Sequence, residues 1–167
     1  ISARALHAEV DGLTALPRVD ILYACIDMPA DLIDGSVASG ARGIVIAGTG
    51  LGHVNKPLYP SLQRAVKAGV HIYMTVQTLW GYVQMFVYDT GRDIMSFGVI
   101  PAGNMLPEVA YVKLGWALGQ SHDHAEVERI MLAPVNGEIT TREPYNGYLV
   151  FQGGIPEVDE FVSEIRR

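Results

Sequence analysis

Three glycines within five residues make up the part of this sequence that is best suited to hold a small ligand. They lie in residues 48–52 (GTGLG), and the polar side chains of His53 and Asn55 follow closely. Glycine allows positive φ angles and lets bare backbone N–H groups approach a bound group. We therefore predict a binding loop that includes Gly50, Gly52, His53 and Asn55.

This loop does not fit the fingerprint of a dinucleotide site. In the pattern G-x-G-x-x-G the third glycine would stand where the sequence has His53. The acidic residue expected at the end of the next strand is also absent, because that strand is predicted to end in Gln77 and Thr78. A plain structural turn is the simpler alternative, yet a turn does not require three glycines followed by histidine and asparagine. The sequence thus predicts a bound small group and no nucleotide cofactor.

Other reactive side chains lack the neighbours that catalysis requires. Lys113 lies in a mostly apolar segment, where a paired or snorkelling lysine is expected rather than a catalytic amine. Cys25 lies in an apolar run with no nearby charge of the kind that lowers a thiol pKa, which predicts a buried thiol and not a nucleophile. The triplet at residues 122–124 (HDH) has no third ligand at a useful spacing, so it predicts a solvated connection and no metal site.

Two further segments offer hydroxyl groups and an acid at the ends of predicted strands or loops. They are residues 75–78 (TVQT) and residues 88–91, which contain Tyr88, Asp89 and Gly91. Neither segment shows a base that is placed to activate a nucleophile. The chain therefore offers a binding edge without a complete catalytic set, so either it only binds or the missing groups lie on another domain.

A sheet of parallel strands is predicted to position these loops. Apolar or β-branched runs alternate three times with helical segments, and such short connections force parallel pairing with right-handed crossovers. The predicted fold is α/β: an open, mostly parallel flavodoxin-like or Rossmann-like sheet of about four strands with helices on both faces. The predicted strands cover residues 19–26, 44–46, 71–78 and 98–100, and the predicted helices cover residues 30–38, 61–68, 89–97, 105–118 and 124–132.

Single residues are predicted to set where these elements begin and end. Pro57 and Pro60 are expected to delay the second helix until Ser61. Asn104 is expected to cap the fourth helix, and Gly119 to end it. A long ordered loop is predicted at residues 79–88, a further strand at 148–151 and a last helix at 156–165.

Length and charge narrow the class of protein. The chain has 167 residues, a net charge of −6 and one cysteine. This length suits one domain, the charge pattern holds no basic cluster for nucleic acid, and a single cysteine fits a reducing cytoplasm. No apolar run approaches the roughly 18 residues that a membrane span needs. Residues 1–18, which begin without methionine, are predicted to be a linker or the remnant of an upstream segment.

Three long sequence words carry a resemblance to a known family. They are GIVIAGTGLGHVN, TVQTLWGYVQMFVYDTGRD and GVIPAGNMLPEVAYVKLGWALG. They resemble the C-terminal half of the L-asparaginase family, and most of all the D-type subunit of the archaeal glutamyl-tRNA(Gln) amidotransferases. The resemblance covers residues 19–139 as an asparaginase-like C-terminal domain, and residues 140–167 look like the extended tail of the D-type subunit.

The resemblance implies a glutaminase that works within a larger complex. Glutamine is hydrolysed to glutamate and ammonia, and a partner subunit of the E type uses ATP, Mg and the ammonia to convert Glu-tRNA(Gln) into Gln-tRNA(Gln). The tRNA is reached only through that partner. The nucleophilic threonine, a second threonine, an aspartate and a lysine belong to the N-terminal domain of the family, so no catalytic residue and no cofactor is expected in this chain.

The resemblance also implies a role for the glycine loop. In this family the C-terminal domain forms a homodimer and completes the active site of the paired protomer with an asparagine after the glycine loop. Because the loop is longer here, either His53 or Asn55 is expected to hold that position. Some members of the family carry an acidic residue in the next loop, and Tyr88, Asp89 and Gly91 are the candidates for its position. The alternatives are the C-terminal half of a cytosolic L-asparaginase and a flavodoxin-like module that binds a small ligand without catalysis.

Overall fold

The computed structural model describes residues 17–141 and 163–164. Within them, four parallel strands form one sheet in the order β1-β2-β3-β4, which confirms the predicted α/β class. The strands are β1 (Val19–Tyr23), β2 (Gly43–Gly48), β3 (His71–Val76) and β4 (Ile100–Pro101). The strand predicted at 148–151 lies outside the described residues, as does all of the last predicted helix except residues 163–164, which are helical.

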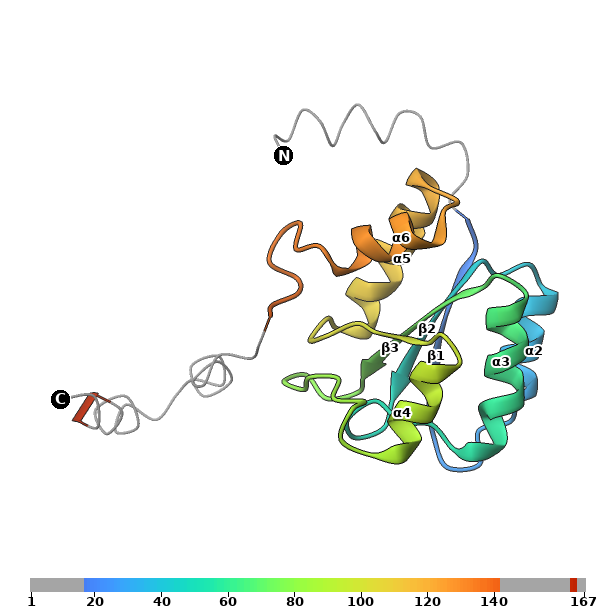
Figure 1. The fold of residues 1–167 in the computed structure, drawn as a ribbon, viewed down its shortest axis with the longest axis horizontal. Coiled ribbons are helices and arrows are strands. Elements are labelled where there is room, and N and C mark those ends of the chain that lie inside the picture. The colour runs from blue at the N-terminus through green and yellow to red at the C-terminus, as the bar shows by residue number, and fades with distance from the viewer. Residues whose placement is uncertain (1–16, 142–162, 165–167) are drawn as a thin grey trace.

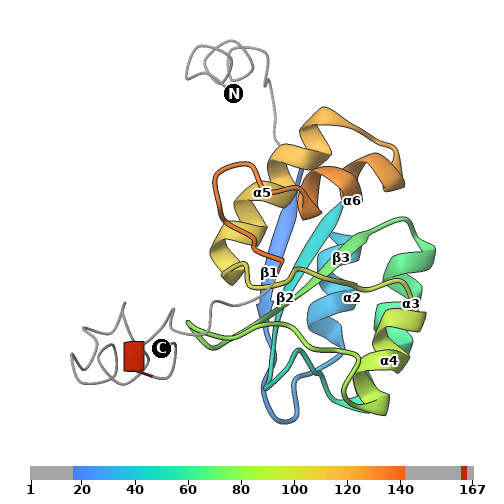
Figure 2. The ribbon, with the colours of Figure 1, turned by 60° about the vertical axis from the view of Figure 1, so that its left-hand side comes forward.

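Helices cover both faces of the sheet (Figures 1 and 2). On one face lie α2 (Asp31–Ala38), α3 (Tyr59–Lys67) and α4 (Asp89–Ser96), each of which connects two successive strands. On the other face lie α5 (Pro107–Gln120) and α6 (His124–Leu132), which follow the last strand. None of the described helices has the length and apolar character that a membrane span requires.

The two central strands contribute to a separate apolar cluster on each face. Ile44 and Ile46 pack with α2, α3 and α4, whereas Val45 between them packs with α5 and α6. In the same way Tyr73, the partner of Val45 in β3, is fully buried in the cluster of α5 and α6. Both faces of these central strands are covered, and the residues of β2 accordingly are apolar without polar alternation, the pattern from which the sequence predicted a buried strand.

Two prolines lie inside helical turns instead of preceding them. Pro57 belongs to a short 3₁₀ helix, η1 (Lys56–Leu58), and Pro60 to the first turn of α3. The expectation that they delay the helix until Ser61 is therefore wrong. A proline in a first turn removes an N–H group that would have no partner within the helix, so it costs little there.

Helix α5 begins and ends differently from the prediction. Leu106, and not Asn104, stands at its N-cap position, and the helix continues through Gly119 to Gln120. It ends where Ser121 becomes extended, with φ −147° and ψ 154°. Gly43 of β2 makes room for this helix, because a Cβ there would lie 2.7 Å from Leu114 Cδ2. A glycine in the sheet thus lets α5 lie close to it.

Candidate functional site

The glycine loop forms a tight turn at the carboxyl end of β2. Thr49 N–H donates to the carbonyl of His53 (2.9 Å), and His53 N–H donates back to the carbonyl of Thr49 (3.0 Å). Between them Gly50 and Gly52 have φ angles of 54° and 99°, which side chains other than glycine rarely adopt. This glycine turn, residues 49–53, lies at the edge of the sheet where loops following parallel strands converge.

The glycines of this region have different structural roles. A Cβ at Gly48 would lie 2.8 Å from the backbone nitrogen of His53, and a Cβ at Gly52 would lie 3.0 Å from side-chain carbons of Met74 and Val83. Close packing therefore explains these two positions without a ligand. Gly50 is exposed and has nothing within 4 Å of an added Cβ, so its backbone is the part of the turn that is open to another molecule.

His53 connects the turn to the start of α4. Its Nδ1 lies 3.1 Å from Thr90 Oγ1, and its ring packs against the ring of Tyr88 with centroids 5.4 Å apart. The backbone carbonyl of Thr90 accepts a hydrogen bond from the Tyr59 hydroxyl (3.3 Å). Burial, aided by Asp93 and Asp89, raises the pKa of Tyr59, so its hydroxyl remains a donor. His53 Nε2 is buried without a hydrogen-bond partner within the part of the chain that the structure describes.

Asn55 lies exposed beside the loop that follows β1. Its Nδ2 donates to the carbonyl of Cys25 (3.3 Å). Cys25 itself is exposed, so the prediction of a buried thiol is wrong. The reason is that β1 ends at Tyr23 and the chain turns, with Met28 N–H donating to the carbonyl of Cys25 (3.3 Å).

Gln77 is a residue of this edge that sequence reasoning did not assign to the site. Its Nε2 donates to the carbonyls of Ala24 (2.6 Å) and Ala47 (2.9 Å), which lie at the ends of the two neighbouring strands. A polar residue directly after a buried strand was the signal for such a role. Its amide group fixes the three strand ends relative to one another.

Tyr88, Asp89 and Gly91 lie where the long loop, residues 79–88, enters α4. Tyr88 is exposed at the N-cap position and contacts His53. Asp89 is exposed, and its Oδ1 accepts from Thr90 N–H (2.9 Å). Gly91 is buried, and a Cβ there would lie 2.2 Å from the carbonyl oxygen of Met85. The structure thus brings Tyr88 to the glycine turn and gives Gly91 a packing role.

The opposite edge of the sheet carries a group of histidines. His124, the first residue of α6, stacks on His71, the first residue of β3, with centroids 4.4 Å apart. Next to them Arg42 NH1 lies 2.9 Å from His122 Nδ1. Asp123 caps α6 by accepting from the backbone N–H of Glu126 (2.9 Å). Among the described residues no three His, Cys, Asp or Glu side chains are grouped so that they could hold a metal ion.

The stability of the fold is expected to fall as the pH falls from about 6.5 to about 4. Burial, then the nearby His124 and Arg42, lower the pKa of His71 to about 4. In this pH range the unfolded chain binds a proton at residue 71 that the folded chain does not, so acid favours unfolding. The loss is on the order of 3 kcal/mol at most. Urea unfolding at pH 7, 5.5 and 4 measures it.

The matched variants for this measurement are His71→Leu and His122→Gln. Leucine fills the buried position without titrating, so His71→Leu is expected to show a smaller loss of unfolding free energy between pH 6.5 and 4. His122 is exposed, so His122→Gln is expected to keep the slope of the unmodified chain. Equal slopes for the unmodified chain and His71→Leu would contradict the assignment to His71.

Comparison with known proteins matches this chain to a known family. The family model described as the glutaminase/asparaginase C-terminal domain matches residues 18–131. The D-type subunit of glutamyl-tRNA(Gln) amidotransferase from Pyrococcus furiosus is 50% identical over 133 residues, and that from Thermococcus kodakarensis is 47% identical over 134 residues. Each match covers 80% of this chain and 30% of the relative.

A solved structure with the same fold supports the match. The thermostable L-asparaginase from Thermococcus kodakarensis superposes with a TM-score of 0.69 at 32% sequence identity, covering 75% of this chain and 39% of that one. The chain thus spans less than a third of the curated relatives that it matches. On the evidence of its sequence and its parallel sheet, the chain belongs to the glutaminase/asparaginase C-terminal domain family.

Proposed function

We propose that this chain is the C-terminal domain of the glutaminase subunit of a tRNA-dependent amidotransferase. The full-length subunit would hydrolyse glutamine to glutamate and ammonia. A partner subunit would use that ammonia with ATP and Mg to convert Glu-tRNA(Gln) into Gln-tRNA(Gln), and it would provide the contacts to tRNA. In this proposal residues 19–139 are the asparaginase-like domain, residues 140–167 are its extension, and the protein works in the cytoplasm.

One observation supports this proposal above the others: the match to the D-type subunits of two glutamyl-tRNA(Gln) amidotransferases, at 50% and 47% identity. The geometry of the chain agrees with a domain that contributes to an active site without forming one. At its carboxyl edge the described residues present a glycine turn, an exposed amide and a tyrosine. The Thr90 hydroxyl lies 3.1 Å from His53 Nδ1, but His53 Nε2 has no partner among the described residues that would orient the ring as a catalytic base. The catalytic groups are therefore expected on another domain of the full-length subunit.

Asn55 is the residue that we assign to the active site of a paired protomer. Its amide is exposed and makes a single hydrogen bond, through Nδ2, among those described. His53 has its Nδ1 directed to Thr90 and its ring against Tyr88, so it is suited to hold the turn in place. In this assignment Asn55 contacts the substrate, His53 positions the turn, and Gly50 leaves its backbone open.

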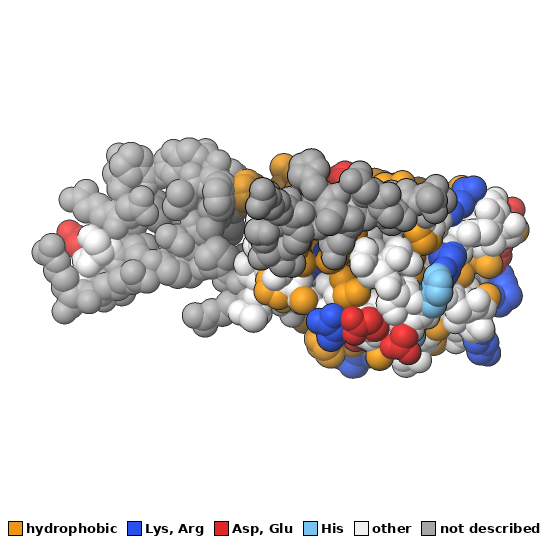
Figure 3. Space-filling model, turned by 90° about the horizontal axis from the view of Figure 1, so that it is seen from above, with side chains coloured by type: hydrophobic (Ala, Val, Ile, Leu, Met, Phe, Trp, Pro, Cys, Tyr) orange, Lys and Arg blue, Asp and Glu red, His pale blue; other side chains and the backbone are white. Residues whose placement is uncertain are grey.

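The exposed apolar side chains of this domain are consistent with a surface that a second protomer covers in a dimer. At the carboxyl edge the exposed large apolar residues are Ile26, Leu79, Trp80, Phe86, Val87 and Tyr88. Apolar side chains also reach the surface around α5 and α6 (Figure 3), and the exposed ones there are Leu106, Val109, Tyr111, Val112 and Leu132. Surfaces of this kind are typical of contacts with another protein. We place the homodimer contact at the carboxyl edge, next to the shared active site.

The test uses the full-length subunit and asks whether two protomers share each active site. One variant carries Asn55→Ala, and a second lacks the nucleophilic threonine that is expected on the other domain. Each is expected to lose glutaminase activity when alone. When the two are mixed and allowed to exchange, half of the dimers are mixed, and each of these has one intact site. About a quarter of the unmodified activity is then expected to return.

Release of ammonia from glutamine measures this outcome, and Gln63→Ala on α3 is the matched control for Asn55→Ala. Normal activity of Asn55→Ala would show that Asn55 is not part of the site. Inactive mixed dimers would show that the sites are not shared between protomers. The isolated 167-residue chain is expected to be inactive, and glutaminase activity of that chain would overturn the proposal.

A second candidate is the C-terminal half of an L-asparaginase. The observation in its favour is the superposition on the asparaginase of Thermococcus kodakarensis at 32% identity. The two candidates differ in their substrate, so the same full-length protein is assayed with asparagine. Preference for asparagine, with no ammonia passed to Glu-tRNA(Gln) in the presence of a partner subunit, would support the asparaginase.

A further inference from the structure

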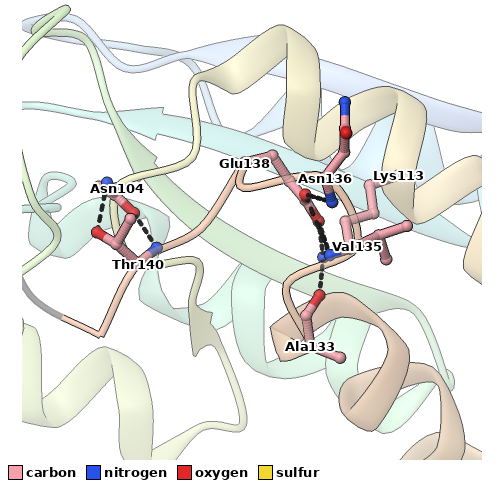
Figure 4. Close-up of polar contacts among 7 residues, drawn as sticks. All are labelled: Asn104, Lys113, Ala133, Val135, Asn136, Glu138 and Thr140. Carbon is pink, nitrogen blue, oxygen red and sulfur yellow. Dashed lines mark hydrogen bonds and ion pairs between the residues drawn. The ribbon is translucent and has the colours of Figure 1, made fainter.

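The segment that follows α6 is fastened back onto the domain at two points (Figure 4). We call residues 133–140 the strap. It leaves the end of α6, passes α5 and reaches the connection between β4 and α5. The match to the family model ends at residue 131, so the strap lies just beyond the matched residues.

The first fastening is a buried ion pair. Lys113 of α5 donates through Nζ to Glu138 and to the carbonyl of Ala133 (2.6 Å). The exposed fractions of the Lys113 and Glu138 side chains are only 6% and 15%. This pairing confirms the prediction of a paired lysine at position 113. It fixes both the beginning and the middle of the strap to α5.

The carboxylate of Glu138 also organises the strap itself. It accepts hydrogen bonds from the backbone N–H groups of Val135 (3.1 Å) and Asn136 (2.7 Å). Burial raises the pKa of Glu138, but the hydrogen bonds from Lys113 and from the backbone of residues 135–138 outweigh it and lower the pKa to about 2. The carboxylate therefore stays ionised at any pH at which the domain is expected to work.

The second fastening joins the end of the strap to two loops of the domain. Thr140 N–H donates to Asn104 Oδ1 (2.9 Å), and Asn104 Nδ2 donates to Thr140 Oγ1 (2.9 Å). The Tyr82 hydroxyl donates to the carbonyl of Thr140 (3.3 Å). The strap thus holds together the loop after β4, which contains Asn104, and the long loop after β3, which contains Tyr82.

Backbone hydrogen bonds continue from these loops to the glycine turn. Val83 N–H donates to the carbonyl of Gly103 (3.0 Å), and Gln84 N–H donates to the carbonyl of Leu51 (2.9 Å). Leu51 lies in the middle of the glycine turn, and Gly103 precedes Asn104. A continuous set of contacts therefore runs from the strap through two loops to the turn.

We propose that the strap is a positioning device for the glycine turn. The first fastening anchors the strap to α5, the second holds the loops at residues 82–84 and 103–104 together, and these loops support the backbone of Leu51. Asn104, Glu138 and Thr140 are then positioning residues for the site, although none of them lies in the turn. The consequence for catalysis rests on the proposed function, whereas the consequence for the structure does not.

The test is amide hydrogen exchange, measured by NMR on the 167-residue chain with the variants Asn104→Ala and Thr140→Val. Asn104→Ala removes both hydrogen bonds between Asn104 and Thr140, whereas Thr140→Val removes the one to the Thr140 hydroxyl and keeps the one from Thr140 N–H. The protection of the Val83 and Gln84 amides is expected to fall about fivefold in Asn104→Ala, which corresponds to the loss of about one hydrogen bond. A smaller fall is expected in Thr140→Val.

The matched control is Ser96→Ala, which removes an exposed side-chain hydrogen bond to the carbonyl of Asp93 at the end of α4. It is expected to leave the Val83 and Gln84 amides unchanged. Loss of protection confined to the strap, with unchanged Val83 and Gln84 amides, would overturn the proposal. If Asn104→Ala unfolds the domain, the Thr140→Val result decides, because the hydrogen bond from Thr140 N–H remains in that variant.

This experiment is independent of the proposed function, because it requires neither substrate nor partner. If Asn104→Ala lowers the protection of the Val83 and Gln84 amides but the full-length subunit has no glutaminase activity, the glutaminase assignment alone is contradicted. If the full-length subunit is active but Asn104→Ala leaves the protection of these amides unchanged, the proposed role of the strap alone is contradicted. In an active subunit, Asn104→Ala is further expected to raise KM for glutamine several-fold more than it lowers kcat, since a displaced turn weakens binding before it alters the nucleophile.

Discussion

Replacing Gly91 with alanine is expected to lower the free energy of unfolding by about 3 kcal/mol or more. The added Cβ would lie 2.2 Å from the carbonyl oxygen of Met85 and 2.8 Å from its Cα, and backbone atoms cannot move aside as a flexible side chain does. The first turn of α4 must then shift, and with it Tyr88 and Thr90, which contact His53. Urea unfolding measures the loss, and the NMR signals of the His53 ring report the shift.

Gly35→Ala is the matched control, because Gly35 also lies within a helix, α2. Nothing lies within 4 Å of a Cβ at that position. Alanine favours a helix over glycine by about 1 kcal/mol, so this variant is expected to be as stable as the unmodified chain or more so. If Gly91→Ala and Gly35→Ala had the same free energy of unfolding, the close approach of α4 to Met85 would not determine the stability of the fold, and the prediction would be wrong.

Breaking the buried ion pair is expected to have the second large effect. Lys113→Met leaves the partly buried Glu138 carboxylate without its cation, and Glu138→Gln leaves the buried Lys113 ammonium without its anion. Each change is expected to cost about 3 kcal/mol of unfolding free energy. The double variant is expected to lose less than the sum of the two, because it leaves no unpaired charge. Urea unfolding of the four proteins measures the coupling.

An exposed ion pair provides the control for this cycle. Arg129 and Glu126 pair on the surface of α6, with exposed side-chain fractions of 66% and 42%. Solvent screens such pairs, so Arg129→Ala is expected to leave the stability nearly unchanged. Additive losses for Lys113→Met and Glu138→Gln would contradict a coupled pair. The pH adds a second check: the low pKa of Glu138 stabilises the fold above about pH 4.5, and this contribution is lost as the pH falls towards 2.

The sequence predicted the sheet well because its central strands are covered on both faces. Residues 44–46 are all apolar and β-branched, so no polar alternation competes with that signal, and residues 71–76 are mostly apolar or β-branched. The end of β1 was harder to predict. Its apolar run continues to Ile26, but the strand ends at Tyr23, since composition does not show where an edge strand stops pairing.

Contacts between distant residues explain most of what the sequence did not predict. Asn104 is a residue type that is common at helix N-caps, yet its side chain forms hydrogen bonds with Thr140, which is 36 residues away. The stacking of His71 on His124 and the bonds from Gln77 to two strand ends are of the same kind. A local pattern predicts a residue's intrinsic preferences, whereas such pairs depend on the folded arrangement of the whole chain.

The glycine turn shows why a site signal is harder to interpret than a fold signal. The glycines were interpreted as a binding loop, and the structure gives Gly48 and Gly52 a packing explanation that applies with or without a ligand. Of the four residues predicted for the loop, Gly50 and Asn55 are the two that are exposed for another molecule. Close backbone packing and contact with a ligand both require glycine, so the sequence alone does not distinguish these two explanations.

The order of the elements along the chain has a consequence for folding during synthesis. Val19 of the first strand packs in the same cluster as Leu114 and Leu118 of α5, nearly a hundred residues later. Until α5 has left the ribosome, one side of the growing sheet, with Val45 and Tyr73, has no cover. Early chains therefore carry a bare apolar surface, and formation of the native state waits for contacts of long sequence separation, which slow folding and invite aggregation. A chaperone that protects nascent chains is expected to bind between the synthesis of β3 and that of α5.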